Sequence, residues 1–113
     1  MDMGRLRNRV EFWGLEKVRQ PTGTFKDTWV QKFSAWAEVI SIGGEEGRVA
    51  AAQSSLVKYR LTLRYRKDVL PAMVVKNIAE GRFMHIRAVR DPDGKKNLLE
   101  LSAEWKQGQT EPS

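Results

Sequence analysis

The stretch KYRLTLRYRK, residues 58–67, alternates apolar and polar side chains with a period of two. Successive side chains of a β-strand point to opposite faces of a sheet, so this pattern predicts a strand with one buried face. The buried face would carry Tyr59, Leu61, Leu63 and Tyr65. The other face would carry four cations that we call the cation row, Lys58, Arg60, Arg64 and Arg66. The cation row is either an ordinary solvated face or a surface that meets something acidic.

Five further stretches have the composition of strands. They cover about residues 10–15, 29–42, 73–78, 82–91 and 97–105. Turn residues separate them, namely Pro21 with Gly23, then Gly81, then the Asp93–Gly94 pair. Six short strands joined by such turns predict an all-β fold, either a small antiparallel barrel or a sandwich.

Two of these stretches indicate which side chains face the core. In residues 29–42 one side carries Phe33, Ala35, Ala37 and Val39, which places Trp36 on the opposite side. In residues 82–91 the more apolar side carries Met84, Ile86, Ala88 and Arg90. Tryptophan is a common core residue, but it is also enriched as an anchor at protein interfaces. Trp36 is therefore a candidate interface residue.

Residues 43–56, GGEEGRVAAAQSSL, lose the alternation. Their three alanines favour a helix, but a helix this short is marginal in water without packing. We therefore expect a long loop or a short helix inserted between the second and third strands. The last residues, 106–113, are polar and are predicted to form a flexible tail beyond a single domain of residues 1–105.

The composition narrows the class of protein. A chain of 113 residues suits one hydrophobic core, and a net charge of +6 favours contact with nucleic acid or with an acidic protein surface. The chain has no cysteine, which excludes disulfides and thiol chemistry. No apolar run approaches the roughly 20 residues that a membrane-spanning helix needs, and the first residues do not resemble a signal peptide. We expect a soluble intracellular product without a membrane partner.

The residues offer little for catalysis. His85 is the only histidine, so a multi-histidine metal site is excluded and a catalytic triad would need a coincidence of folding. Glu45 and Glu46 are adjacent, and adjacent residues of a helix do not face the same way. We therefore predict a structural or binding module rather than an enzyme, with no cofactor and no metal site. The alternative is a basic β-barrel that binds nucleic acid without sequence specificity.

Taken in order, the motifs resemble a known family. The segments GRLRNRVEF (4–12), TWVQKFSAWAEVISI (28–42), AAAQSS (50–55), YRLTLRYRKDV (59–69) and GRFMHIRAVRDPDGKKNLLELSAEW (81–105) follow one another as in the head–tail joining proteins of tailed bacteriophages and prophages. These proteins are also called head-closure, stopper or head–tail adaptor proteins. The resemblance covers about residues 4–105, nearly the whole chain.

The resemblance implies a small antiparallel β-barrel with its long loop between the second and third strands. It implies a structural virion protein that forms a ring, a dodecamer, at the head–tail connector, where it closes the DNA-filled head and provides the tail attachment site. Its partners would be copies of itself, portal or adaptor proteins, tail proteins, and genomic DNA that passes through the channel without sequence specificity. Assembly would take place in the cytoplasm of the bacterial host.

Two groups of candidate residues follow from the resemblance. The loop would line or gate the channel through Gly43, Gly44, Glu45, Glu46, Arg48 and Gln53. The subunit or partner interface would include Arg5, Arg7, Arg9, Trp36 and the cation row. In a ring, the cation row would pair with acidic residues of a neighbour, such as Asp27, Glu38 or Glu100, or would contact DNA phosphates. We favour the interface, because a conduit that held DNA tightly would obstruct its passage.

Overall fold

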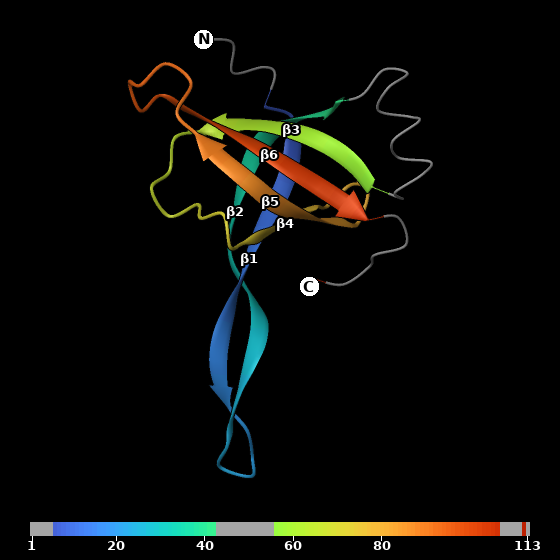
Figure 1. Ribbon diagram of the computed structural model, residues 1–113, viewed down its shortest axis with the longest axis vertical. Coiled ribbons are helices and arrows are strands. Elements are labelled where there is room, and N and C mark those ends of the chain that lie inside the picture. Colours follow the sequence, from blue (N-terminus) through green and yellow to red (C-terminus); the bar gives the residue numbers. More distant parts are fainter. Residues whose placement is uncertain (1–5, 43–55, 107–111, 113) are drawn as a thin grey trace.

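The structure of the protein is a computed structural model, which describes residues 6–42, 56–106 and 112. Within these residues all regular structure is β-strand. The strands are β1 (Asn8–Arg19), β2 (Phe25–Ile42), β3 (Leu56–Arg64), β4 (Val74–Asn77), β5 (Arg82–Arg90) and β6 (Leu98–Lys106), as Figure 1 shows. The predicted loop, residues 43–56, lies outside the described residues except for Leu56, which the structure places at the start of β3. Its six channel candidates, Arg5 and most of the predicted tail also lie outside the described residues.

The six strands form one antiparallel sheet that closes on itself. Its order is β1-β2-β3-β6-β5-β4, and β4 returns to pair with β1 between Val10–Trp13 and Val74–Asn77. Closure gives each strand a neighbour on both sides over at least part of its length, which protects its backbone groups there from unwanted pairing. The prediction of an all-β fold with six antiparallel strands is confirmed.

The core lies inside the closed sheet and is built by alternation. Tyr59, Leu61 and Leu63 of β3 are buried, as their spacing predicted. Phe12 of β1 is fully buried and stacks on Phe33 of β2, with 4.8 Å between the ring centroids. The predicted inner side of β2 is also confirmed, because Phe33, Ala35, Ala37 and Val39 all belong to the core or pack against it.

Strand β5 departs from its predicted pattern at one point. Met84 and Ile86 face the core as expected, but the pairing of β5 with β6 shifts between Ile86 and Ala88. A β-bulge adds one residue to a strand and so reverses which face the following side chains occupy. Val89 therefore packs against the core, and the prediction that Ala88 and Arg90 continue the inner face was wrong.

The first two strands are longer than predicted and extend beyond the closed sheet. The expected strands began and ended near residues 10–15 and 29–42, whereas β1 and β2 pair continuously out to Arg19 and Phe25. Their register shifts between Phe12 and Trp13, where β2 carries one extra residue. Beyond Trp13, which still pairs with Val74 of β4, β1 and β2 pair only with each other among the described strands, and Figure 1 shows this hairpin projecting from the body. We call residues 14–30 the arm.

The predicted turns are placed correctly. Gly23 at the tip of the arm, Gly81 between β4 and β5, and Gly94 between β5 and β6 all have positive φ angles. Glycine adopts this backbone conformation without the steric penalty of a side chain, which explains its use there. The Gln20 and Thr24 backbones close the turn around Gly23 through a 2.7 Å hydrogen bond.

Candidate partner interface

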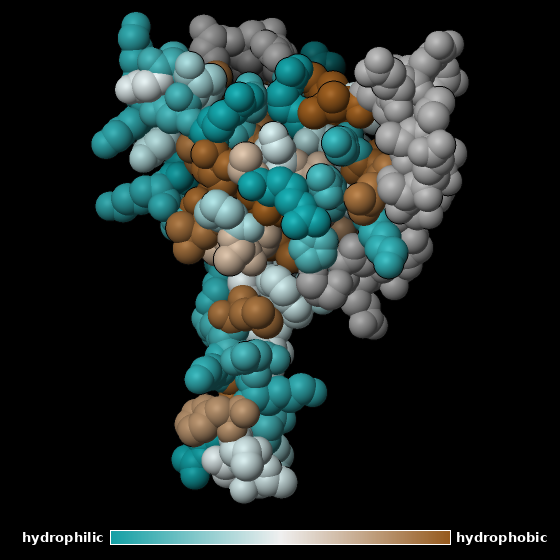
Figure 2. Space-filling view, viewed as in Figure 1, coloured by the Kyte–Doolittle hydropathy of each residue, from teal (hydrophilic) through white to brown (hydrophobic). Residues whose placement is uncertain are grey.

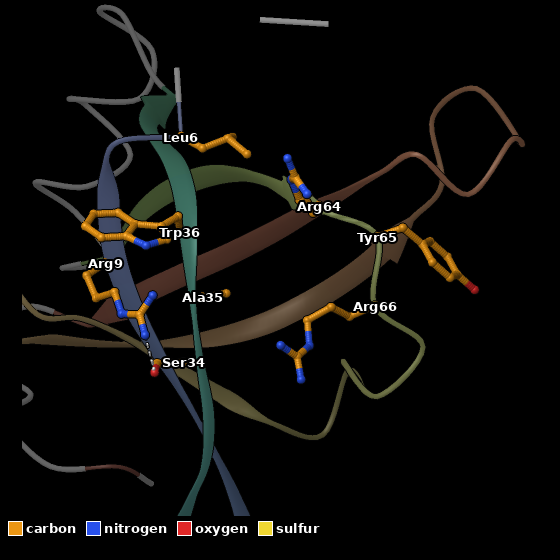
Figure 3. Close-up of a pocket in the computed structure, with 8 residues that line it drawn as sticks. All are labelled: Leu6, Arg9, Ser34, Ala35, Trp36, Arg64, Tyr65 and Arg66. Carbon is orange, nitrogen blue, oxygen red and sulfur yellow. Dashed lines mark hydrogen bonds between the residues drawn. The ribbon is translucent and has the colours of Figure 1, made fainter. Parts of the chain in front are cut away.

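A pocket of about 600 Å³ lies where β2 continues past the end of β3. Because β3 ends at Arg64, the following chain turns away and leaves this part of β2 without a neighbour on that side. The pocket is lined by Leu6, Arg9, Ser34, Ala35, Trp36, Arg64, Tyr65 and Arg66 (Figure 3). We call it the arginine pocket. No acidic residue is among those that line it.

Arg9 and Trp36 form one wall of the arginine pocket. They are direct partners in the pairing of β1 with β2, so their side chains share the outer face of the sheet. The Arg9 guanidinium lies 5.2 Å from the Trp36 ring centroid and donates a hydrogen bond to Ser34 Oγ at 3.0 Å. Trp36 nevertheless keeps 54% of its surface exposed. The predicted outward position of Trp36 is therefore confirmed, and its role as an anchor stays a prediction.

Arg64 and Arg66 contribute the other cations, and they differ in how they are held. Figure 3 shows them across the β2 ribbon from Trp36 and Arg9. Arg66 lies 4.0 Å above the Phe33 ring and donates two hydrogen bonds of 3.0 Å to the Asp68 carboxylate. This hydrogen bonding lowers the pKa of Asp68 and raises that of Arg66. Arg64, by contrast, is exposed and makes no ion pair with any described residue.

The cation row is therefore not one continuous stripe. Its strand ends at Arg64, and Arg66 lies on the following segment with its charge compensated by Asp68. Lys58 and Arg60 lie farther along β3 and do not line the arginine pocket. The structure thus brings together four of the predicted interface residues, Arg9, Trp36, Arg64 and Arg66.

The outer face of β3, β6 and β5 mixes both signs of charge. Lys58 is the cross-strand partner of Glu104, which accepts a 3.2 Å bond from Arg87 on β5. Glu100 is likewise paired with Arg90. Nucleic-acid surfaces are usually continuous basic patches, and the acids on β6 interrupt this one. Of the three acidic partners considered from the sequence, Glu100 is already paired within the chain and Glu38 has an interaction of its own.

Four further residues line the arginine pocket: Leu6 and Ser34 were not singled out from the sequence, and Ala35 and Tyr65 were predicted only for the inner faces of their strands. They meet there only because β1, β2 and the end of β3 are adjacent, and local patterns do not encode that adjacency. Arg7, a predicted interface residue, is exposed just before β1 and has an interaction of its own.

The described part of the chain contains no cluster of three or more histidine, cysteine, aspartate or glutamate residues that could hold a metal ion. His85 is half-buried on β5, and its burial, aided by the nearby Arg87, lowers its pKa, while Glu104 opposes the shift. The burial of His85 therefore favours its neutral form. No helix in residues 6–42 or 56–106 is long and apolar enough to cross a membrane.

The fold and the arginine pocket define a small closed β-sheet protein with a cationic and aromatic surface on its outer side. The chain belongs to the phage head completion protein family, whose sequence profile matches residues 1–106. The resemblance stated from the motifs is thereby confirmed, and with it the class of structural phage protein. The nucleic-acid-binding alternative is not favoured.

Individual relatives agree with this family. The head completion protein gp7 of Enterobacteria phage HK97 is 30% identical over 69 residues, which are 61% of this chain and 62% of that protein. The match thus spans less than two thirds of that relative's length. The solution structure of protein SF1141 from Shigella flexneri 2a has a TM-score of 0.71 at 27% identity and covers 96% of this chain and 100% of its own.

A chain from the virion of a native gene transfer agent particle shares the same fold. Its TM-score is 0.58 at 20% identity, over 88% of this chain and 94% of that one.

Proposed function

We propose that this chain is a subunit of a ring at the head–tail connector of a tailed phage or prophage. The ring closes the DNA-filled head and provides the site to which the tail attaches. The observation that carries this proposal is the family match over residues 1–106, which covers nearly the whole chain. A closed sheet with exposed charged and aromatic side chains is typical of a rigid structural subunit that binds other proteins.

The arginine pocket is the first contact surface in this proposal. Trp36 is large, exposed and held beside Arg9, and tryptophan and arginine are the residues that most often dominate the energy of protein interfaces. Arg64 makes no ion pair with any of the described residues, so its guanidinium can pair with an acidic group of a partner. The partners we propose are neighbouring copies and the portal, adaptor or tail proteins of the connector.

The DNA channel belongs to the same proposal. Genomic DNA passes through the centre of a ring of twelve copies without sequence-specific contacts. Gly43, Gly44, Glu45, Glu46, Arg48 and Gln53 line or gate that channel. Lys58, Arg60, Arg5 and Arg7 remain candidates for contact with neighbouring subunits. The ring is assembled in the cytoplasm of the bacterial host and remains in the virion.

The proposal can be tested by adding the purified chain to particles that lack it. DNA-filled heads and free tails from a lysate without this chain should join when the wild-type protein is added, and joined particles can be counted by electron microscopy. Trp36→Ala and Arg64→Glu should each reduce joining by about tenfold or more, because each removes an anchor worth roughly 2 kcal/mol.

The matched control is Lys95→Glu, which makes the same change of charge in the β5–β6 loop outside the arginine pocket. It should join heads and tails like the wild type. A wild-type chain that does not restore joining contradicts the proposed function. A wild-type chain that restores it while both pocket variants remain fully active contradicts the role given to the arginine pocket.

A further inference from the structure

The arm has one face that the described chain leaves uncovered. Residues paired across an antiparallel ladder share a face, so the register places Leu15 with Trp29, Lys17 with Asp27, and Arg19 with Phe25 on the same side. Leu15 is 54% exposed and Phe25 is 66% exposed. Figure 2 shows apolar groups along the arm, set among hydrophilic ones and away from the body. We call this side the apolar face of the arm.

The opposite face of the arm is different in character. It carries Gly14 with Val30, Glu16 with Thr28, and Val18 with Lys26. Glu16 is already in an ion pair with Lys32, and Val18 is the only large exposed apolar residue on this side among those described. The two most exposed large apolar side chains of the hairpin, Leu15 and Phe25, therefore lie on the same face.

An arm of this kind has no structural need for exposed leucine and phenylalanine. A two-stranded ribbon is marginally stable alone, and exposed apolar groups at its end add nothing to the core. Clusters of large exposed apolar residues on a soluble protein usually mark a surface that another molecule covers. The arm also projects away from the body, so its apolar face is open to a partner (Figure 1).

We propose that the apolar face of the arm docks on a different protein of the connector, on a surface that is apolar and carries acidic residues. The charges on this face indicate that the partner surface carries acidic residues. The face has two cations, Lys17 and Arg19, and one acid, Asp27, and none of the three makes an ion pair within the described chain. The partner's carboxylates pair with Lys17 and Arg19, while Phe25 and Leu15 fill its apolar surface. This inference rests on the proposed connector function.

Other occupants fit the arm less well. A second copy of this chain carries a net charge of +6, and two such arm faces together would place four cations, Lys17 and Arg19 from each copy, against only two acids, Asp27 from each copy. DNA would satisfy the two cations but would leave Phe25 and Leu15 exposed, because a phosphate backbone offers no apolar surface to bury them. An acidic protein surface with an apolar centre meets both requirements.

The test uses neighbouring positions that point to opposite faces of β2. Since the chain has no cysteine, Asp27→Cys and Lys26→Cys each introduce a single thiol. Maleimide labelling is then compared between the free chain and intact particles. Residue 27, on the apolar face of the arm, should be labelled about tenfold more slowly in particles, because docking buries it, whereas residue 26 should change little.

Carbodiimide cross-linking of wild-type particles identifies the occupant, because it joins a lysine to a carboxylate that touches it. Lys17 should be linked to an aspartate or glutamate of a different protein, and Leu15→Ser should abolish that link. Equal labelling of residues 26 and 27 in particles, or a link from Lys17 to another copy of this chain, overturns the inference. Absence of the chain from particles would instead be a failure of the proposed function.

Discussion

Two phenylalanines of this chain offer a direct test of where its core ends. Phe12 is fully buried and stacks on Phe33, whereas Phe25 at the end of the arm is 66% exposed. Truncating a buried phenylalanine to alanine costs about 3–5 kcal/mol, and the lost ring stacking accounts for about 0.5–1.5 kcal/mol of that. An exposed phenylalanine without core contacts should cost no more than about 0.5 kcal/mol.

Phe12→Ala should therefore remove a large part of a total stability of about 5–15 kcal/mol, and Phe25→Ala should leave it almost unchanged. Urea unfolding followed by tryptophan fluorescence measures both, because the chain has four tryptophans. The melting temperature of Phe12→Ala should fall by more than about 10 °C.

The same chemical change at two positions makes the comparison its own control. A loss above about 1.5 kcal/mol for Phe25→Ala would mean that the arm packs on the body, and a loss below about 1 kcal/mol for Phe12→Ala would mean that the core is elsewhere. Either result would refute the division into a closed body and a projecting arm.

Three further predictions concern single features. Gly94→Ala should lower the free energy of unfolding by about 1 kcal/mol in urea titrations because the φ of Gly94 is +69°, whereas Gly94→Asn should cost less, since asparagine tolerates this conformation. Burial lowers the pKa of His85, so the contribution of this side chain to stability is present above about pH 6.5, its usual pKa, and is lost as the pH falls through the folded-state pKa. When the pH is lowered from about 7.5 to about 5, the His85→Gln variant should therefore lose less free energy of unfolding than the wild type does. Glu104→Gln, which breaks a partly exposed ion pair with Arg87, should cost under about 1 kcal/mol, and a much larger drop in the urea midpoint would contradict that assignment.

The faces of β3 could be predicted from the sequence because residues 58–64 alternate without interruption. The bulge in β5 could not, because one extra residue reverses the faces without any signal in composition, and Val89 therefore changed sides. The length of the arm was missed for a related reason. Charged residues lie on both of its faces, Lys17 and Arg19 on one and Lys26 on the other, so no regular alternation marked its outer residues as strand.

The arginine pocket depends on contacts between distant parts of the chain. Arg9 and Trp36 are brought together by the register of β1 with β2, and Arg64 reaches them because β3 ends beside that pair. Each residue was a reasonable interface candidate from its type and position. Which of them share a surface is decided by strand pairing, and therefore only the folded chain reveals that Lys58 and Arg60 lie apart from the other cations.

The most direct test of the account is electron microscopy of a lysate from the phage or prophage that encodes this chain, with its gene deleted and all others intact. The account predicts separate tails beside unjoined heads, some of them emptied of DNA, and normal particles when the gene is restored. Joined, infectious particles in the absence of the gene would contradict the central claim that this chain completes the head.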